Sequence, residues 1–136
     1  MDLEAEWAGI TLATYAGGDV VREFRLVGVP AVQPAAGLRA LAAGVFNRGN
    51  VAHRVSFVCT RPPFASPEAC SQFQADHALA FLAITGNGDF EFSLGAKDYA
   101  LHAAVVTRRE PVEFFGTTVA YAYEITGGEL EDVTPP

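Results

Sequence analysis

The sequence has few of the residues that usually mark a chemical site or a membrane segment. It contains two cysteines, Cys59 and Cys70, too few for a disulfide framework and without the spacing of a metal-binding motif. No apolar run approaches the roughly 20 residues of a membrane span. The acidic start Met1–Glu4 lacks the basic and apolar regions of a signal peptide. We therefore expect no membrane association and a protein that is cytoplasmic when made, with two buried free thiols.

Positive charge is also scarce. Nine Lys and Arg stand against sixteen Asp and Glu, which gives a net charge of −7. Proteins that bind nucleic acids are usually basic, so this balance argues against specific nucleic-acid binding. Charged residues make up 18% of the chain and hydrophobic residues 50%, which argues against disorder. So low a charged fraction predicts a folded domain that hides part of its surface in an oligomer.

The motifs of catalytic and metal sites are missing as well. The three histidines do not form the short pairs of zinc sites: His53, His77 and His102. There is no Gly-x-Ser-x-Gly elbow, and the pair Gly86-x-Gly88 follows a predicted helix where a dinucleotide site needs a strand. An enzyme would need these histidines to converge with Cys70, an acid or a metal. We predict no enzyme activity, no cofactor, and no catalytic, cofactor-binding or metal-binding residues.

The sequence does contain a strand–helix–three-strand module between Ala52 and Gly127. Alternation in Ala52–Thr60 predicts a strand. The run Ser66-Pro67-Glu68 combines an N-cap, a proline at the first helical position and an early acidic residue, and it predicts a helix over about 66–83. An apolar stripe would pack this helix on a sheet: Cys70, Phe73, His77, Ala80, Phe81 and Ile84. Alternation then predicts three strands: Asp89–Leu94, Tyr99–Arg109 and Thr117–Thr126.

Two more strands are predicted before this module. Glu6–Tyr15 and Val20–Leu26 would pair as a hairpin around Gly17-Gly18-Asp19. The following segment, Val27–Asn50, is rich in proline and glycine and predicts a long loop, with at most one or two helical turns at Leu38–Ala43. Loops of this length are usually functional or are ordered by a partner.

The C-terminal residues 129–136 predict an acidic, frayed tail. The chain as a whole therefore predicts one mainly β (α+β) domain over residues 1–128. From the residues alone, the expected fold is a β-rich domain with one α-helix packed on a sheet.

Two stretches have a familiar order of elements. The first runs from the strand Arg54–Arg61 into the helix start Ser66–Phe73, and the second joins Ala104–Arg108 to the return strand Thr118–Ile125. Together they resemble the tail-tube and distal-tail (minor tail) protein family of long-tailed bacteriophages. The resemblance covers roughly Val20–Gly127 and rests on element order, not on a signature motif.

The resemblance implies an antiparallel β-sandwich or split barrel with one flanking α-helix. It also implies a structural subunit that associates into a ring, hexameric in this family, in a tail or baseplate. Its partners would be copies of itself and other tail proteins, and its location a phage, prophage or phage-derived particle. The loop over 27–50 would become ordered against neighbouring subunits, and the acidic balance would suit a tube through which DNA slides. Tube, distal-tail and other minor tail roles all stay open. The alternative is a small-ligand-binding barrel or sandwich without catalysis, with four aromatic residues around a cavity: Phe90, Phe92, Tyr121 and Tyr123.

Overall fold

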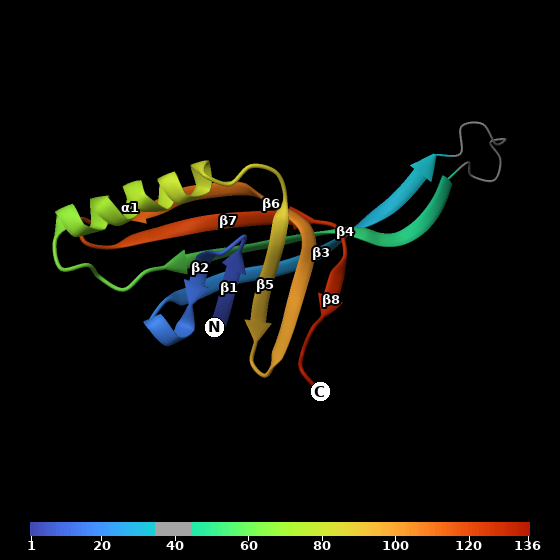
Figure 1. The fold of residues 1–136 in the computed structure, drawn as a ribbon, viewed down its shortest axis with the longest axis horizontal. Coiled ribbons are helices and arrows are strands. Elements are labelled where there is room, and N and C mark those ends of the chain that lie inside the picture. Colours follow the sequence, from blue (N-terminus) through green and yellow to red (C-terminus); the bar gives the residue numbers. More distant parts are fainter. Residues whose placement is uncertain (35–44) are drawn as a thin grey trace.

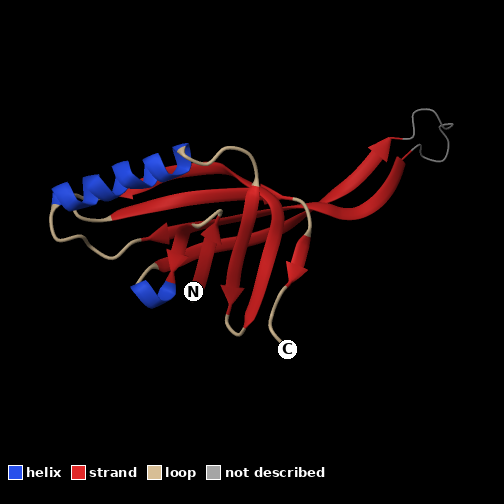
Figure 2. Ribbon diagram, viewed as in Figure 1, coloured by secondary structure: helices blue, strands red, loops and turns tan. Residues whose placement is uncertain are grey.

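We describe the fold from a computed structural model, which describes residues 1–34 and 45–136. The described chain is mostly strand, with one long α-helix, α1 (Pro67–Leu82), and one short 3-10 turn, η1 (Tyr15–Gly17) (Figure 2). The strands are β1 (Leu3–Trp7), β2 (Ile10–Thr14), β3 (Val20–Pro34), β4 (Val45–Thr60), β5 (Gly88–Leu94), β6 (Lys97–Phe114), β7 (Val119–Gly127) and β8 (Leu130–Asp132). No helix in these residues has both the length and the hydrophobicity needed to cross a membrane.

The strands form two sheets that share one long strand, β6. All neighbours are antiparallel and follow the order β2-β1-β5-β6-β7-β4-β3, with β8 added beside β6. The first half of β6 pairs with β5 and β8, and its second half pairs with β7. We call β2, β1, β5, β8 and the first half of β6 sheet A, and β3, β4, β7 and the second half of β6 sheet B. This arrangement is an antiparallel β-sandwich or open barrel, and it confirms the predicted mainly β fold class with a single flanking helix.

β6 passes from one sheet to the other at Ala103. This alanine has φ of 52°, a left-handed conformation that is unusual for a residue with a side chain. Its neighbour Ala104 is the last β6 residue to pair with β5, and Val105 is the first to pair with β7. The bend therefore acts as a bulge that turns the strand from sheet A into sheet B.

The predicted helix and its start are confirmed. Ser66 is the N-cap, and its hydroxyl accepts a hydrogen bond from the backbone N–H of Ala69 at 3.1 Å. The helix lies along β6 and β7 and covers one side of the sandwich (Figure 1). Its inward stripe reaches the core, where Phe81 stacks on Trp7 with ring centroids 5.6 Å apart.

The N-terminal prediction is wrong in two respects. The expected strand over Glu6–Tyr15 is a hairpin, β1 and β2, with its turn at Ala8-Gly9, where both residues have positive φ. In addition, β2 and β3 do not pair, because they lie at opposite ends of the strand order. Thr14 caps η1 through a 3.2 Å hydrogen bond from Gly17 N–H, so the chain turns away instead of folding back.

The prediction of a long loop over Val27–Asn50 is also wrong for its described parts. β3 runs on to Pro34 and β4 begins at Val45, and the two strands stay paired from Val20↔Thr60 to Pro34↔Val45. Proline in this segment suggested a loop, but β3 is an edge strand, where a missing N–H donor is tolerated. The helical turns predicted at Leu38–Ala43 lie outside the described residues.

The C-terminal tail is not wholly frayed either. Leu130–Asp132 forms β8, whose residues pair with Tyr99–Leu101 of β6. The turn that returns the chain is fixed by a 2.9 Å hydrogen bond from Gly128 N–H to the carbonyl oxygen of His102. Glycine is needed at Gly127 because the backbone passes close to β6 there: a Cβ atom would lie 2.6 Å from Cγ of Leu101.

Candidate functional site

The structure does not bring the three histidines together. His77 lies in α1, and its Nε2 is 2.7 Å from the hydroxyl oxygen of Tyr123. His53 lies on β4, with Nδ1 2.8 Å from the carbonyl oxygen of Gly128. His102 lies on β6, near carboxylates of β5 and β8. Within residues 1–34 and 45–136, no three His, Cys, Asp or Glu side chains are placed to hold a metal ion.

His77 is a buried core residue that is neutral at physiological pH. Burial lowers its pKa to about 4, and the nearby charges of Arg109 and Arg61 act in the same direction. Its ring lies between those of Phe73 and Phe81, with centroids 5.3 and 5.0 Å away. The hydrogen bond to Tyr123 satisfies one ring nitrogen. The His77 ring therefore finds both its packing neighbours and a polar partner within the core.

The two cysteines are free and buried, as predicted. Burial raises the pKa of Cys59 to about 12, and the carboxylate of Asp19 raises it further. A thiol with so high a pKa is not a nucleophile at neutral pH. Asp19 itself is buried and binds Arg61 at 2.9 Å and the N–H of Thr14 at 3.0 Å. These contacts tie the end of β4 to the start of β3, which is a structural role.

The four aromatics proposed for a ligand cavity belong to the packed core. All four are buried, with at most 2% of each residue exposed: Phe90, Phe92, Tyr121 and Tyr123. Phe90 and Phe92 stack at 5.0 Å between ring centroids, and Tyr121 and Tyr123 at 5.9 Å. Phe57 contacts both groups, at 6.5 Å from Phe90 and 5.4 Å from Tyr123. The rings therefore pack against one another.

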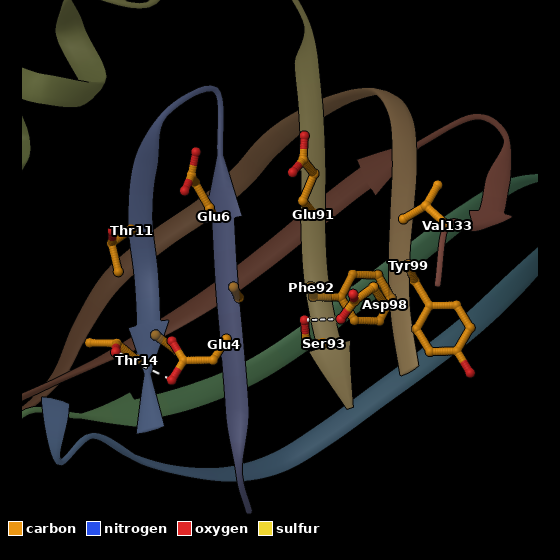
Figure 3. A pocket seen from close by; sticks show the side chains of 12 residues that line it. Glu4, Glu6, Thr11, Thr14, Glu91, Phe92, Ser93, Asp98, Tyr99 and Val133 are labelled. Atoms are coloured by element: carbon orange, nitrogen blue, oxygen red, sulfur yellow. Dashed lines mark hydrogen bonds between the residues drawn. The ribbon is translucent and has the colours of Figure 1, made fainter. Parts of the chain in front are cut away.

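A shallow depression of about 440 Å³ lies on the outer face of sheet A. Figure 3 shows the acidic side chains around it, Glu4 and Glu6 from β1, Glu91 from β5 and Asp98 from β6. Glu6 and Glu91 lie directly opposite each other in the β1–β5 pair. Like charges in this position destabilise a sheet, so the fold carries an electrostatic cost on this face.

The charge of the whole chain is divided very unevenly. Residues 1–17, 88–104 and 129–136, which build sheet A and the C-terminus, hold nine acidic residues and one basic residue, Lys97, for a net charge of −8. The rest of the chain holds seven acidic and eight basic residues, for a net charge of +1. Alternation placed Glu6 and Glu91 on predicted strands, but sequence reasoning left Glu4 outside them and missed that all three share one face.

The β3–β4 hairpin has the opposite character. From Phe24 to Pro67 the chain contains no Asp or Glu and five arginines: Arg25, Arg39, Arg48, Arg54 and Arg61. This signal is visible in the sequence, but it acquires a meaning only once the segment is known to be a paired ribbon. Arg39 lies outside the described residues.

The outer part of this hairpin projects from the body of the domain (Figure 1). β7 ends at Gly127, which pairs with His53, and His53 pairs in turn with Gly28 of β3. Beyond that point the described residues 29–34 and 45–52 pair only with each other. We call these residues the arm. Both edges of the arm lack a neighbouring strand in the described chain, and such edges are templates for pairing with another chain.

The opposite end of sheet B is apolar and exposed. Phe114 and Phe115, in the connection from β6 to β7, are 51% and 72% exposed. Val20, at the start of β3, is 59% exposed at the same end. The aromatic pair in this connection therefore does not cap the core.

Searches of protein-family models and of curated protein sequences find no match to this chain.

Proposed function

We propose that this chain is a structural subunit that associates with copies of itself into a ring, without catalysis. The observation that carries the proposal is the arm, a two-stranded ribbon that extends beyond the sheet with both of its edges unpaired in the described chain. An isolated two-stranded ribbon is at best marginally stable in water. A partner that pairs with or packs on the arm would supply the missing contacts.

Ordering the arm costs free energy. Ordering the backbone of each arm residue costs about 1–2 kcal/mol of conformational entropy. Among the described residues, only the pairing between β3 and β4 offsets that cost, because none of the described strands runs beside the arm as a third strand. Contact with a neighbouring subunit would offset the remainder, and the arm would then be ordered in the assembly.

The more specific assignment rests on the resemblance to tail-tube and distal-tail proteins. It proposes a ring, hexameric in that family, in the tail or baseplate of a phage, prophage or phage-derived particle. Other tail proteins would be its further partners. The antiparallel sandwich with a single helix along one side is compatible with this role, and the acidic net charge would keep DNA from adhering to the assembly.

The test is to compare the full chain with a variant whose arm is removed. The variant replaces residues 30–51 with Asn-Gly, so that a two-residue turn joins Val29 to Ala52. Val29 and Ala52 face each other in the β3–β4 pair, and Asn-Gly favours such a turn, so the paired base of the hairpin is kept. We expect the full chain to form rings by electron microscopy and a discrete oligomer by light scattering. We expect the variant to stay monomeric, to unfold cooperatively and to keep the helix and sheet signals of the domain in its circular dichroism spectrum.

The proposal fails if the full chain stays monomeric at every concentration and shows no rings or tubes. It also fails if the shortened variant assembles as well as the full chain, because the arm would then have no part in association.

A further inference from the structure

We propose that the outer face of sheet A is the docking surface for the arm of a second copy of this chain. The inference rests on the proposed ring-forming function and adds to it the surface that receives the arm. It follows from the shape of the face, from the charges on it and from the direction in which the arm points.

The face carries negative charge that the described residues do not neutralise. The pairing register places Thr11, Glu6, Glu91, Ala100 and Glu131 side by side across five strands. Neither Glu6 nor Glu91 has a hydrogen-bond or ion-pair partner in the part of the chain that the structure describes. The two basic groups nearby already have partners: Lys97 lies 3.5 Å from Asp132, and His102 lies 3.2 Å from Asp89.

The face is also shaped to admit another backbone. Short side chains occupy the positions around the carboxylates, with Thr11 and Thr14 on β2 and Ser93 on β5 lining the depression (Figure 3). A chain in extended conformation can approach a surface of short side chains closely, while the longer glutamates reach its cationic groups.

The arm and its base match this surface in charge. The segment from Arg25 to Arg54 contains four arginines and no acidic residue. Three arginines of the described chain already face carboxylates on sheet B: Arg54 lies 3.7 Å from Glu124, Arg108 lies 2.9 Å from Glu110, and Arg22 binds Glu113. Within the acid-free stretch this leaves Arg25 and Arg48 of the described ranges, and the carboxylates Glu6 and Glu91 on sheet A offer them opposite charge.

The direction of the arm makes the contact intermolecular. The arm extends away from the body, at the end of sheet B where β7 stops (Figure 1). Its target on a second copy is a different surface from the arm itself, so the contact is heterologous. Repetition of a heterologous contact produces a closed ring when the rotation between subunits closes, and a filament when it does not.

The experiment uses charge reversal on each side of the proposed contact. Arg48→Glu changes the arm, and Glu6→Lys with Glu91→Lys changes the face. We expect each variant to raise the concentration for half-assembly, measured by light scattering, by about tenfold or more, because like charges then oppose each other. The triple variant, with both sides reversed, should regain assembly. A matched control, Glu68→Lys with Asp76→Lys on exposed positions of α1, changes net charge equally and should assemble normally.

Each other result overturns the inference in a recognisable way. If the wild type assembles and the arm is required, but neither reversal weakens assembly, the docking inference fails and the proposed function stands. If only the Glu6 and Glu91 reversal weakens assembly, another basic partner occupies the face. If only Arg48→Glu weakens it, the arm docks elsewhere. A wild type that never assembles refutes the proposed function itself.

Discussion

Neutral, buried His77 should make the domain lose stability as the solution becomes acidic. Its pKa is lowered from 6.5 to about 4 in the folded protein, because the ring is buried beside Tyr123 and near two arginines. The unfolded chain therefore binds a proton on this residue below pH 6.5, and the folded chain binds it only near pH 4. The free energy of unfolding is therefore not reduced by His77 above pH 6.5, and it decreases as the pH falls from 6.5 toward 4.

The size of the effect follows from the shift. A difference of about 2.5 pKa units corresponds to about 3.4 kcal/mol when the loss is complete, at about 1.36 kcal/mol per unit. At pH 5 the unfolded histidine is almost fully protonated and the folded one is mostly neutral, so about 2 kcal/mol should already be lost. His77 is only 6% exposed, so solvent screening reduces this figure little.

The assay is urea unfolding at pH 7 and pH 5, at one fixed low protein concentration. Trp7 is the single tryptophan. It is buried and stacks on Phe81 of α1, the helix that also carries His77, so its fluorescence reports on this part of the core. The comparison variant is His77→Gln, which does not titrate and can still hydrogen-bond the hydroxyl of Tyr123. Effects of the other titrating groups cancel between the two proteins.

We expect the wild type to lose about 2 kcal/mol more than His77→Gln between pH 7 and pH 5. Equal losses in both proteins would refute the reasoning, because His77 would then have the same pKa folded and unfolded. A smaller loss in the wild type than in the variant would mean that folding raises the pKa of His77, contrary to its burial.

Three further predictions concern packing, capping and the thiols. Gly127→Ala should destabilise the domain by about 1–3 kcal/mol in urea unfolding, because the new Cβ would lie 2.6 Å from Cγ of Leu101; unchanged stability would show that β6 can move aside. Ser66→Ala should cost about 1 kcal/mol through loss of the helix N-cap, and Ser66→Asp should recover most of it. Cys59 and Cys70 should resist a thiol reagent in the native protein and react in urea; fast native labelling of either would contradict its burial.

Local signals predicted the parts of the fold that depend on neighbours in sequence. The start of α1 was readable because the cap, the proline and the acidic residue act within one turn. The strands β5, β6 and β7 were readable because large apolar residues recur at every second position along much of each one. Their ends differ from the prediction by at most five residues. The largest difference is at Phe114, because β6 continues as an edge strand past Arg109, where Pro111 is tolerated.

The two wrong predictions, the loop over Val27–Asn50 and the hairpin around Gly17-Gly18, have one common cause. Pro30, Pro34 and several glycines suggested a loop, but whether a proline is tolerated in a strand depends on which side of that strand has a neighbour. In the same way, Gly17-Gly18 suggested a hairpin between two strands that the structure places at opposite edges. Sequence spacing carries no information about strand order, which is fixed by contacts between distant segments.

The sequence by itself determined the fold class, the single helix, the two buried thiols and the acidic balance, because composition and local periodicity control these properties. Only the tertiary structure decided where the charge lies. It gathers Glu4, Glu6 and Glu91 from two strands onto one face and extends the acid-free hairpin beyond the sheet. Pairing between strands some 85 residues apart in the chain creates that face, and no local pattern records such a pairing.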